Sequence, residues 1–177
     1  MANLRRQGED AQAVAMREAL IQHFKGHPYG RDPLAALNTI PAITREDMIQ
    51  FLSTYFVPAN MVVAISGDIQ LDPVRHTLAR FIAGLPTGEP PPRQTAAPLT
   101  APPAVALIHK PGQVQSNVVA ILPGLTRADS AYWNLSLLMS VFGGNDSLMY
   151  TRLRDDLGYV YSAGFYQAAK WQAGLLV

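Results

Sequence analysis

The 177 residues are enough for one domain or two small ones, and an apolar content of 49% excludes a chain that is disordered throughout. The 14 Lys and Arg against 13 Asp and Glu leave a net charge of +1, which gives no electrostatic footprint for nucleic acid or an acidic membrane. Because there is no cysteine, disulfide frameworks, thiolate metal sites and cysteine nucleophiles are excluded. Charged residues make up only 15%, against about 25% usually, which predicts surfaces covered by other protein parts.

The sequence offers no targeting or membrane segment. No run approaches the ~20 apolar residues of a membrane span, so we expect none. Arg5, Arg6, Glu9 and Asp10 interrupt the start of the chain, which therefore does not resemble a secretory signal. Nothing in these residues chooses between a bacterial periplasm and a cytoplasm.

The first part of the chain is mainly helical. Apolar spacing predicts an amphipathic helix from Glu9 and Asp10 to Phe24, and an irregular loop over 27–41. Thr44 and Asp47 form a capping-box pattern that opens a helix to Phe56. A buried strand is expected over 61–66, followed by a helix over 74–83 with Asp72 as its N-cap and Pro73 at its first position.

A proline-rich stretch then divides the chain. Residues 86–103 contain seven prolines, which neither a helix nor a sheet interior tolerates, so we expect an extended linker. After it the pattern predicts strands over 104–109 and 115–122, then helices from Asp129 or Ser130 to Phe142 and over 147–157. Gly158 is expected to end the last helix in a left-handed conformation, before strands over 159–167 and 171–177.

This order predicts an α+β protein of two incomplete units, 1–85 and 104–177, joined by the linker 86–103. The last predicted strand reaches the C-terminus without a turn signal. The first helix has nothing before it in its own half to pack against. We therefore expect both units to continue beyond this chain.

Residue types that often take part in catalysis are present, but they do not form a complete catalytic motif. His23 and His27 are four apart, but Phe24 and Gly26 stand where a zinc-peptidase helix needs Glu, and Pro28 ends the helix. Serine-nucleophile signatures are missing, and the adjacent Asp155 and Asp156 do not face each other on a helix. From the residues alone, no complete active site is predicted.

One pair of donors stands apart from these. Arg154 ends the predicted helix and Tyr161 follows the turn at Gly158, so the two side chains can converge on one point. A guanidinium and a phenol are suitable donors for a peptide carbonyl or a developing oxyanion. The strand period alone does not choose Tyr161 over Tyr159. The alternative is an arginine that caps exposed carbonyls beside a core tyrosine.

Several short motifs, in order, resemble the pitrilysin/insulinase-type zinc metallopeptidases, which include mitochondrial processing peptidase-like proteins. The motifs lie in the segments 27–31, 43–47, 51–55, 57–61, 65–68, 110–116, 142–144 and 150–162. The resemblance implies repeated α/β half-domains, with mostly antiparallel sheets flanked by helices, around a chamber. This chain would contain the end of the first peptidase-like unit and the start of the second, substrate-binding and zinc-free unit.

The resemblance also implies roles. Arg154 and Tyr161 match the family's Arg/Tyr pair that binds the substrate backbone, and Gly143 and Gly144 match a glycine loop near the substrate. The family's inverted zinc motif, His-x-x-Glu-His, is absent here, so zinc is expected in the parent protein and not in this chain. No catalytic or metal-binding residue is then expected in this chain.

Three functions remain open at this point. The chain is a silent piece of a zinc endopeptidase, a non-catalytic subunit that pairs with a separate zinc-bearing chain, or a structural peptide-binding module. The expected partners are a peptide substrate and the remaining peptidase domain or a homologous zinc-bearing subunit, with a dimer as a further state. No nucleic acid is expected as a partner, and no membrane span is expected.

Overall fold

The computed structural model describes residues 2–92, 103–144 and 146–177. They fall into two compact units, the first from Met1–Leu37 with Thr95–Val177 and the second from Asn38–Gln94. Part of the expected linker, residues 93–102, lies outside the described residues. The division into 1–85, 86–103 and 104–177 therefore stays a prediction.

The first unit begins with two helices, α1 (Ala2–Glu9) and α2 (Ala11–His23). Asp10 is the N-cap of α2 because its side chain accepts a hydrogen bond from the Ala13 amide at 2.7 Å. A helix is thus present where one was predicted, although its apolar residues are not gathered on one face, and α1 was not expected. The Lys110 ammonium donates to the carbonyls of Gly8 (3.4 Å) and Glu9, at the C-terminal end of α1, where the helix dipole favours a cation.

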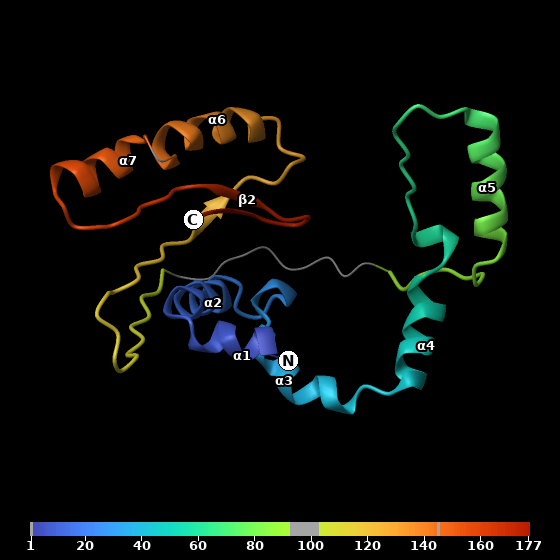
Figure 1. Cartoon of the computed structure of the whole chain (residues 1–177), viewed down its shortest axis with the longest axis horizontal. Helices are drawn as coiled ribbons and strands as arrows, with labels where there is room; N and C mark the ends of the chain where they lie inside the picture. Colours follow the sequence, from blue (N-terminus) through green and yellow to red (C-terminus); the bar gives the residue numbers. More distant parts are fainter. Residues whose placement is uncertain (1, 93–102, 145) are drawn as a thin grey trace. The chain divides into compact units, whose positions relative to one another are not determined.

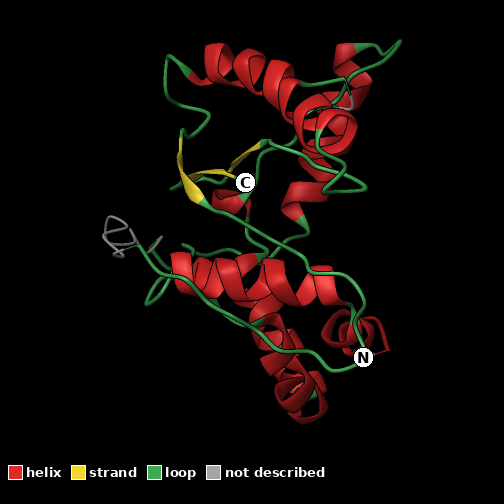
Figure 2. Ribbon diagram, turned by 90° about the vertical axis from the view of Figure 1, so that its left-hand side faces the viewer, coloured by secondary structure: helices red, strands yellow, loops and turns green. Residues whose placement is uncertain are grey.

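The C-terminal half of this unit carries helices beside a small sheet (Figures 1 and 2). Its elements are, in chain order, β1 (Leu122–Gly124), α6 (Tyr132–Gly143), α7 (Leu148–Tyr150), a π-helical segment (Thr151–Asp156), β2 (Gln167–Ala169) and β3 (Gly174–Leu176). Strand β3 lies between β1 and β2 and is antiparallel to both. Helix α6 and the short α7 follow one another beside the hairpin that carries β2.

The core of this unit joins sequence-distant segments. Phe24 (0% exposed) packs in one cluster with Ala173 and Leu175 (2% exposed), so the end of α2 lies against β3. Burying such side chains is the main favourable contribution to folding. The segment that follows α2 and the C-terminal strand therefore meet in this core.

The second unit contains α4 (Arg45–Tyr55) and α5 (Leu71–Ala83). The capping box is confirmed: the Asp47 amide donates to Thr44 Oγ1 at 3.1 Å, and the Thr44 amide donates to Asp47 Oδ2 at 2.8 Å. Among its described residues, Val57 is the only buried apolar side chain. The apolar side chains of its two helices are exposed instead. In the sequence, the division between the two units falls within α3 (Ala36–Thr39).

Several predicted strands are wrong as strands. Residues 61–66, 104–109 and 115–121 lie in no strand, and Val62 is 98% exposed. The expected strand over 159–167 forms only from Gln167, and the C-terminal one only over Gly174–Leu176. A strand exists only where a neighbour supplies hydrogen bonds, which β3 does for β1 and β2 but no described segment does for 61–66.

Some helix boundaries also differ from the prediction. Helix α5 begins at Leu71 with Gln70 as N-cap, so Pro73 lies inside its first turn. Helix α6 begins at Tyr132, because the Asp129 carboxylate accepts hydrogen bonds from Thr126 instead of capping the helix. Four short helical turns were not expected: Pro28–Gly30, Pro33–Ala35 and α3 in the predicted loop 27–41, and Ile40–Ala42 across its end.

The chain is α+β, as predicted. In the described part of the chain, no helix has the length and apolar character needed to cross a membrane.

Candidate functional site

Arg154 lies near the end of a helix whose last turn is π-helical. Ser147 caps α7 by accepting a hydrogen bond from the Tyr150 amide at 3.2 Å, and the helix then widens into the π-helical segment Thr151–Asp156. Such segments are rare in proteins and are frequent at functional sites. Gly158 has a φ of 64°, which confirms the predicted left-handed residue after the helix.

Backbone hydrogen bonds fix this turn. The Gly158 amide donates to the Arg154 carbonyl, and the Tyr159 amide donates to the Leu153 carbonyl, both at 3.0 Å. The turn at Gly158 ends the helix four residues after Arg154. It therefore brings the residues that follow Gly158 back toward the arginine side chain.

Arg154 lies over two tyrosine rings. Its guanidinium carbon is 5.0 Å from the ring centroid of Tyr150 and 5.2 Å from that of Tyr161. Both distances are within the range of a cation–π interaction. The structure thus brings together the two residues that the sequence singled out, and adds a third, Tyr150, that the sequence reasoning missed. The Tyr150–Arg154 spacing of four residues on a helix is the signal that would have found it.

The same contacts distinguish Tyr161 from Tyr159. Both side chains are exposed, at 81% and 76%, but the ring contact with Arg154 belongs to Tyr161. The alternative of a core tyrosine does not apply to Tyr161, because it is exposed.

The N–H groups of Arg154 and the hydroxyl of Tyr161 donate no hydrogen bond to a described residue. No described carboxylate forms an ion pair with Arg154, whereas Arg152 pairs with Asp156 at 3.0 Å. A guanidinium offers five N–H donors and a phenol one, so the pair has spare capacity for an acceptor.

The two glycines differ in what surrounds them. A Cβ atom on Gly143, the last residue of α6, would lie 1.5 Å from the carbonyl oxygen of Phe165, so this position requires glycine for close backbone packing. A Cβ on Gly144 would meet the Ser140 carbonyl oxygen at 3.5 Å, an ordinary contact.

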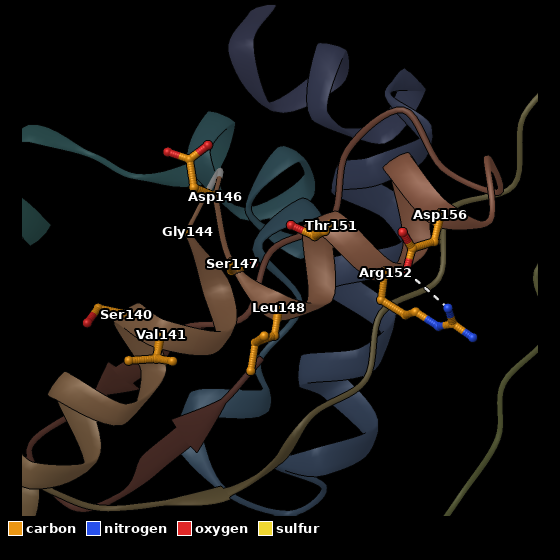
Figure 3. A pocket seen from close by; sticks show the side chains of 9 residues that line it. All are labelled: Ser140, Val141, Gly144, Asp146, Ser147, Leu148, Thr151, Arg152 and Asp156. Atoms are coloured by element: carbon orange, nitrogen blue, oxygen red, sulfur yellow. Dashed lines mark hydrogen bonds and ion pairs between the residues drawn. The ribbon is translucent and has the colours of Figure 1, made fainter.

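An open hollow of about 640 Å³ lies beside α6 and α7 (Figure 3). Gly144 is part of its lining, but Gly143, Arg154 and Tyr161 are not. The structure therefore does not bring the four predicted site residues to one hollow. The lining residues are Ser140, Val141, Gly144, Asp146, Ser147, Leu148, Thr151, Arg152 and Asp156.

The histidines do not form a metal site. His23 ends α2, whereas His27 precedes the next helical turn and accepts a hydrogen bond at Nδ1 from the Tyr29 amide at 2.9 Å. Burial lowers the pKa of His23, whose Nε2 has no hydrogen-bond partner among the described residues. Among the residues that the structure describes, no group of three or more His, Asp or Glu is placed to hold a metal ion. The described residues therefore do not fit a zinc site.

Comparison with known proteins places these observations in a family context. The family model of the peptidase M16 inactive domain matches residues 42–177. An uncharacterized zinc protease of Mycobacterium leprae is 28% identical over 145 residues, covering 78% of this chain and 32% of that protein. One of Streptomyces coelicolor is 27% identical over 159 residues, covering 86% of this chain and 34% of that protein. The chain thus spans about a third of the length of these relatives.

Solved structures share the fold. The crystal structure of a peptidase M16 inactive domain from Pseudomonas fluorescens matches with a TM-score of 0.70 at 22% identity, covering 99% of this chain and 42% of that chain. A chain in the structure of complex III2 from Candida albicans, with Inz-5 bound, matches with a TM-score of 0.66 at 15% identity, covering 99% and 43%. At these identities the likeness concerns the fold alone.

Proposed function

This chain belongs to the peptidase M16 inactive-domain family, and we propose from this membership that it supplies the substrate-binding wall of a zinc-dependent endopeptidase. In this proposal the Arg154 guanidinium and the Tyr161 hydroxyl bind backbone carbonyls of an extended peptide or an unfolded protein segment. Relatives of this chain carry the name zinc protease, which supports the reaction class.

The observation that carries the proposal is the pairing of two exposed donors at one point. Arg154 lies 5.2 Å from the Tyr161 ring, and neither side chain donates to a described group. A peptide carbonyl has two lone pairs and can accept from both donors at once. Recognition through the backbone depends little on the side chains of the substrate, as a peptidase of broad range requires.

The role of this chain is to position the substrate. Holding a peptide in register with the reacting groups removes part of the entropic cost of the reaction. The metal chemistry is assigned to residues outside this chain, because the described residues offer no zinc site. The remaining peptidase domain, or a separate zinc-bearing subunit, is the proposed partner.

The test uses the full-length protein that contains this chain, with peptide cleavage as the readout. Arg154→Ala removes charged hydrogen bonds to the peptide, so kcat/KM is expected to fall roughly ten- to hundredfold. Tyr161→Phe removes one neutral hydrogen bond, and the expected fall is about two- to tenfold.

Two matched controls lie at the same corner. Arg152→Ala removes a neighbouring arginine whose partner is Asp156, and Tyr159→Phe removes the other exposed hydroxyl. Both are expected to leave cleavage within about twofold of the parent protein. If Arg154→Ala and Tyr161→Phe behave like these controls, the proposal is wrong and a structural module is the better description. Cleavage that needs a separately purified zinc-bearing subunit would identify the chain as part of a non-catalytic partner.

In this proposal Gly143 and Gly144 lie near the bound substrate. The close approach of Phe165 already explains glycine at position 143. Gly144 borders the open hollow and has room for a methyl group. A substrate contact at these residues therefore predicts that Gly144→Ala lowers peptide affinity in a protein of unchanged stability.

A further inference from the structure

The structure assigns a further role to Tyr150: we infer that it is a positioning residue, whose ring holds the Arg154 guanidinium ready for a peptide carbonyl. This inference rests on the proposed function of Arg154. It adds a residue that the Arg154–Tyr161 pair alone does not include, and the observation behind it is the 5.0 Å contact between the Arg154 guanidinium carbon and the Tyr150 ring centroid.

Tyr150 is anchored, whereas Tyr161 is not. The Tyr150 amide donates to Ser147 Oγ at 3.2 Å, and the Ser147 side chain is buried at 3% exposure. Tyr150 is itself half-buried at the end of α7, whereas Tyr161 is 81% exposed. The ring of Tyr150 is thus the partly covered one, on a backbone that the Ser147 cap holds, and we take it to be the ring that orients the arginine before a ligand is present.

The chemistry of the contact preserves the arginine for binding. A carboxylate partner would occupy the N–H donors, as Asp156 does for Arg152 at 3.0 Å. An aromatic face attracts the cation through its quadrupole instead, and accepts none of the five N–H groups in a conventional hydrogen bond. Tyr150 thus limits the motion of a long side chain while leaving its donors available. Ordering the arginine before binding lowers the entropic cost of binding.

The spacing explains why Tyr150 and Arg154 meet. Residues four apart on a helix lie on the same face, and the chain between them crosses from α7 into the π-helical segment. Arg154 lies within the π-helical segment, and after the turn at Gly158 the ring of Tyr161 lies 5.2 Å from the same guanidinium carbon.

The test is a double-mutant cycle in the full-length protein, read as KM and kcat for a peptide substrate. Tyr150→Leu removes the ring and is expected to raise KM about two- to fivefold, with little change in kcat. Tyr150→Phe retains the aromatic face and is expected to keep the parent KM. In an Arg154→Ala background, Tyr150→Leu is expected to have no further effect, because the residue that it positions is gone.

The outcomes separate this inference from the proposed function. If Arg154→Ala leaves cleavage unchanged, the proposed function fails. If Arg154→Ala lowers cleavage but Tyr150→Leu has no effect, or the same effect in both backgrounds, the positioning role of Tyr150 is wrong. Should Tyr150→Leu fail to fold, pentafluorophenylalanine at this position is compared with Tyr150→Phe. It has nearly the same shape but a reversed ring quadrupole, so an unchanged KM would overturn the inference and a raised KM would support it.

Discussion

The backbone of Gly143 lies so close to Phe165 that a Cβ atom on Gly143 would be 1.5 Å from the Phe165 carbonyl oxygen. This contact holds the end of α6 against the segment that leads into β2. The obstructing atoms belong to the backbone, so no side-chain rotation relieves the overlap. Glycine is therefore required here by packing.

Gly143→Ala is expected to destabilise the protein by about 1–3 kcal/mol or more, because the two backbone segments must separate. Thermal or urea unfolding of the purified chain measures this effect. Gly144→Ala is the matched control: the residue has φ −77° and ψ 176°, which any residue adopts, and the nearest atom lies 3.5 Å from the added Cβ. Equal stabilities of the two variants would contradict the packing argument.

The carboxylates of Asp47 and Asp129 are expected to titrate below the usual range of aspartate. Hydrogen bonds from the Thr44 amide and hydroxyl lower the pKa of Asp47, and hydrogen bonds from the Thr126 hydroxyl and amide lower the pKa of Asp129. A carboxylate with a lowered folded pKa stabilises the fold above its unfolded pKa, and this contribution disappears as the pH falls through the folded value. Carbon-detected NMR titration measures both midpoints.

Thr44→Val separates the two sites. It removes the hydroxyl that donates to Asp47 Oδ2 at 2.7 Å and retains a β-branched side chain. The pKa of Asp47 is expected to rise toward its ordinary value, while that of Asp129 stays low. A common shift of both midpoints would point to a global change and not to the local hydrogen bond.

His23 is expected to make the stability of the chain depend on pH near neutrality. Burial lowers the pKa of His23 in the folded chain, so the unfolded chain binds a proton more readily below the ordinary value of about 6.5. Stability is therefore expected to fall as the pH decreases from about 6.5 toward the folded pKa, and to level off below it. Urea unfolding at several pH values between 7 and 5 measures the slope.

His23→Phe is expected to flatten this slope, since the replacement does not titrate. His76→Phe makes the same change at an exposed position of α5 and serves as the control. If the two variants keep the same pH dependence as the parent chain, His23 is not its origin.

The purified chain is expected to bind no stoichiometric zinc and to cleave no peptide. The physical reason is that the described residues place no three candidate ligands together, and a zinc site needs three or four. Elemental analysis after dialysis, beside a peptide-cleavage assay, measures both properties. One equivalent of zinc that survives dialysis would refute the expectation.

Features that depend on neighbouring residues could be predicted from the amino-acid pattern. Thr44 caps its helix as the capping-box pattern predicted, and the helix predicted over 147–157 begins at the cap Ser147, because a cap is a contact over three or four residues. Gly158 adopts its left-handed conformation for the same local reason. The predicted caps Asp72 and Asp129 are wrong, since Gln70 and Ala131 are the N-caps of those helices. The ordered motifs also indicated the family to which residues 42–177 belong.

Which extended segments form strands depended on contacts between distant parts of the chain. Residues 61–66 and 104–109 have the composition of strands but form none. The hydrogen-bond partners of a strand come from other parts of the fold, so the sequence of the segment alone does not show whether it has them. The short sheet forms where β3 meets β1 and β2, and its Leu175 packs in one cluster with Phe24 from α2.

At the candidate site the division is the same. The helix end and the turn at Gly158 were readable from the sequence, and they predicted that Arg154 and a tyrosine converge. The choice of Tyr161 over Tyr159, and the contact with Tyr150, depended on where the side chains lie in three dimensions. Hydrogen bonds between neighbouring residues form the helix end and the turn, whereas the ring contacts of Arg154 depend on the positions of side chains in the folded chain.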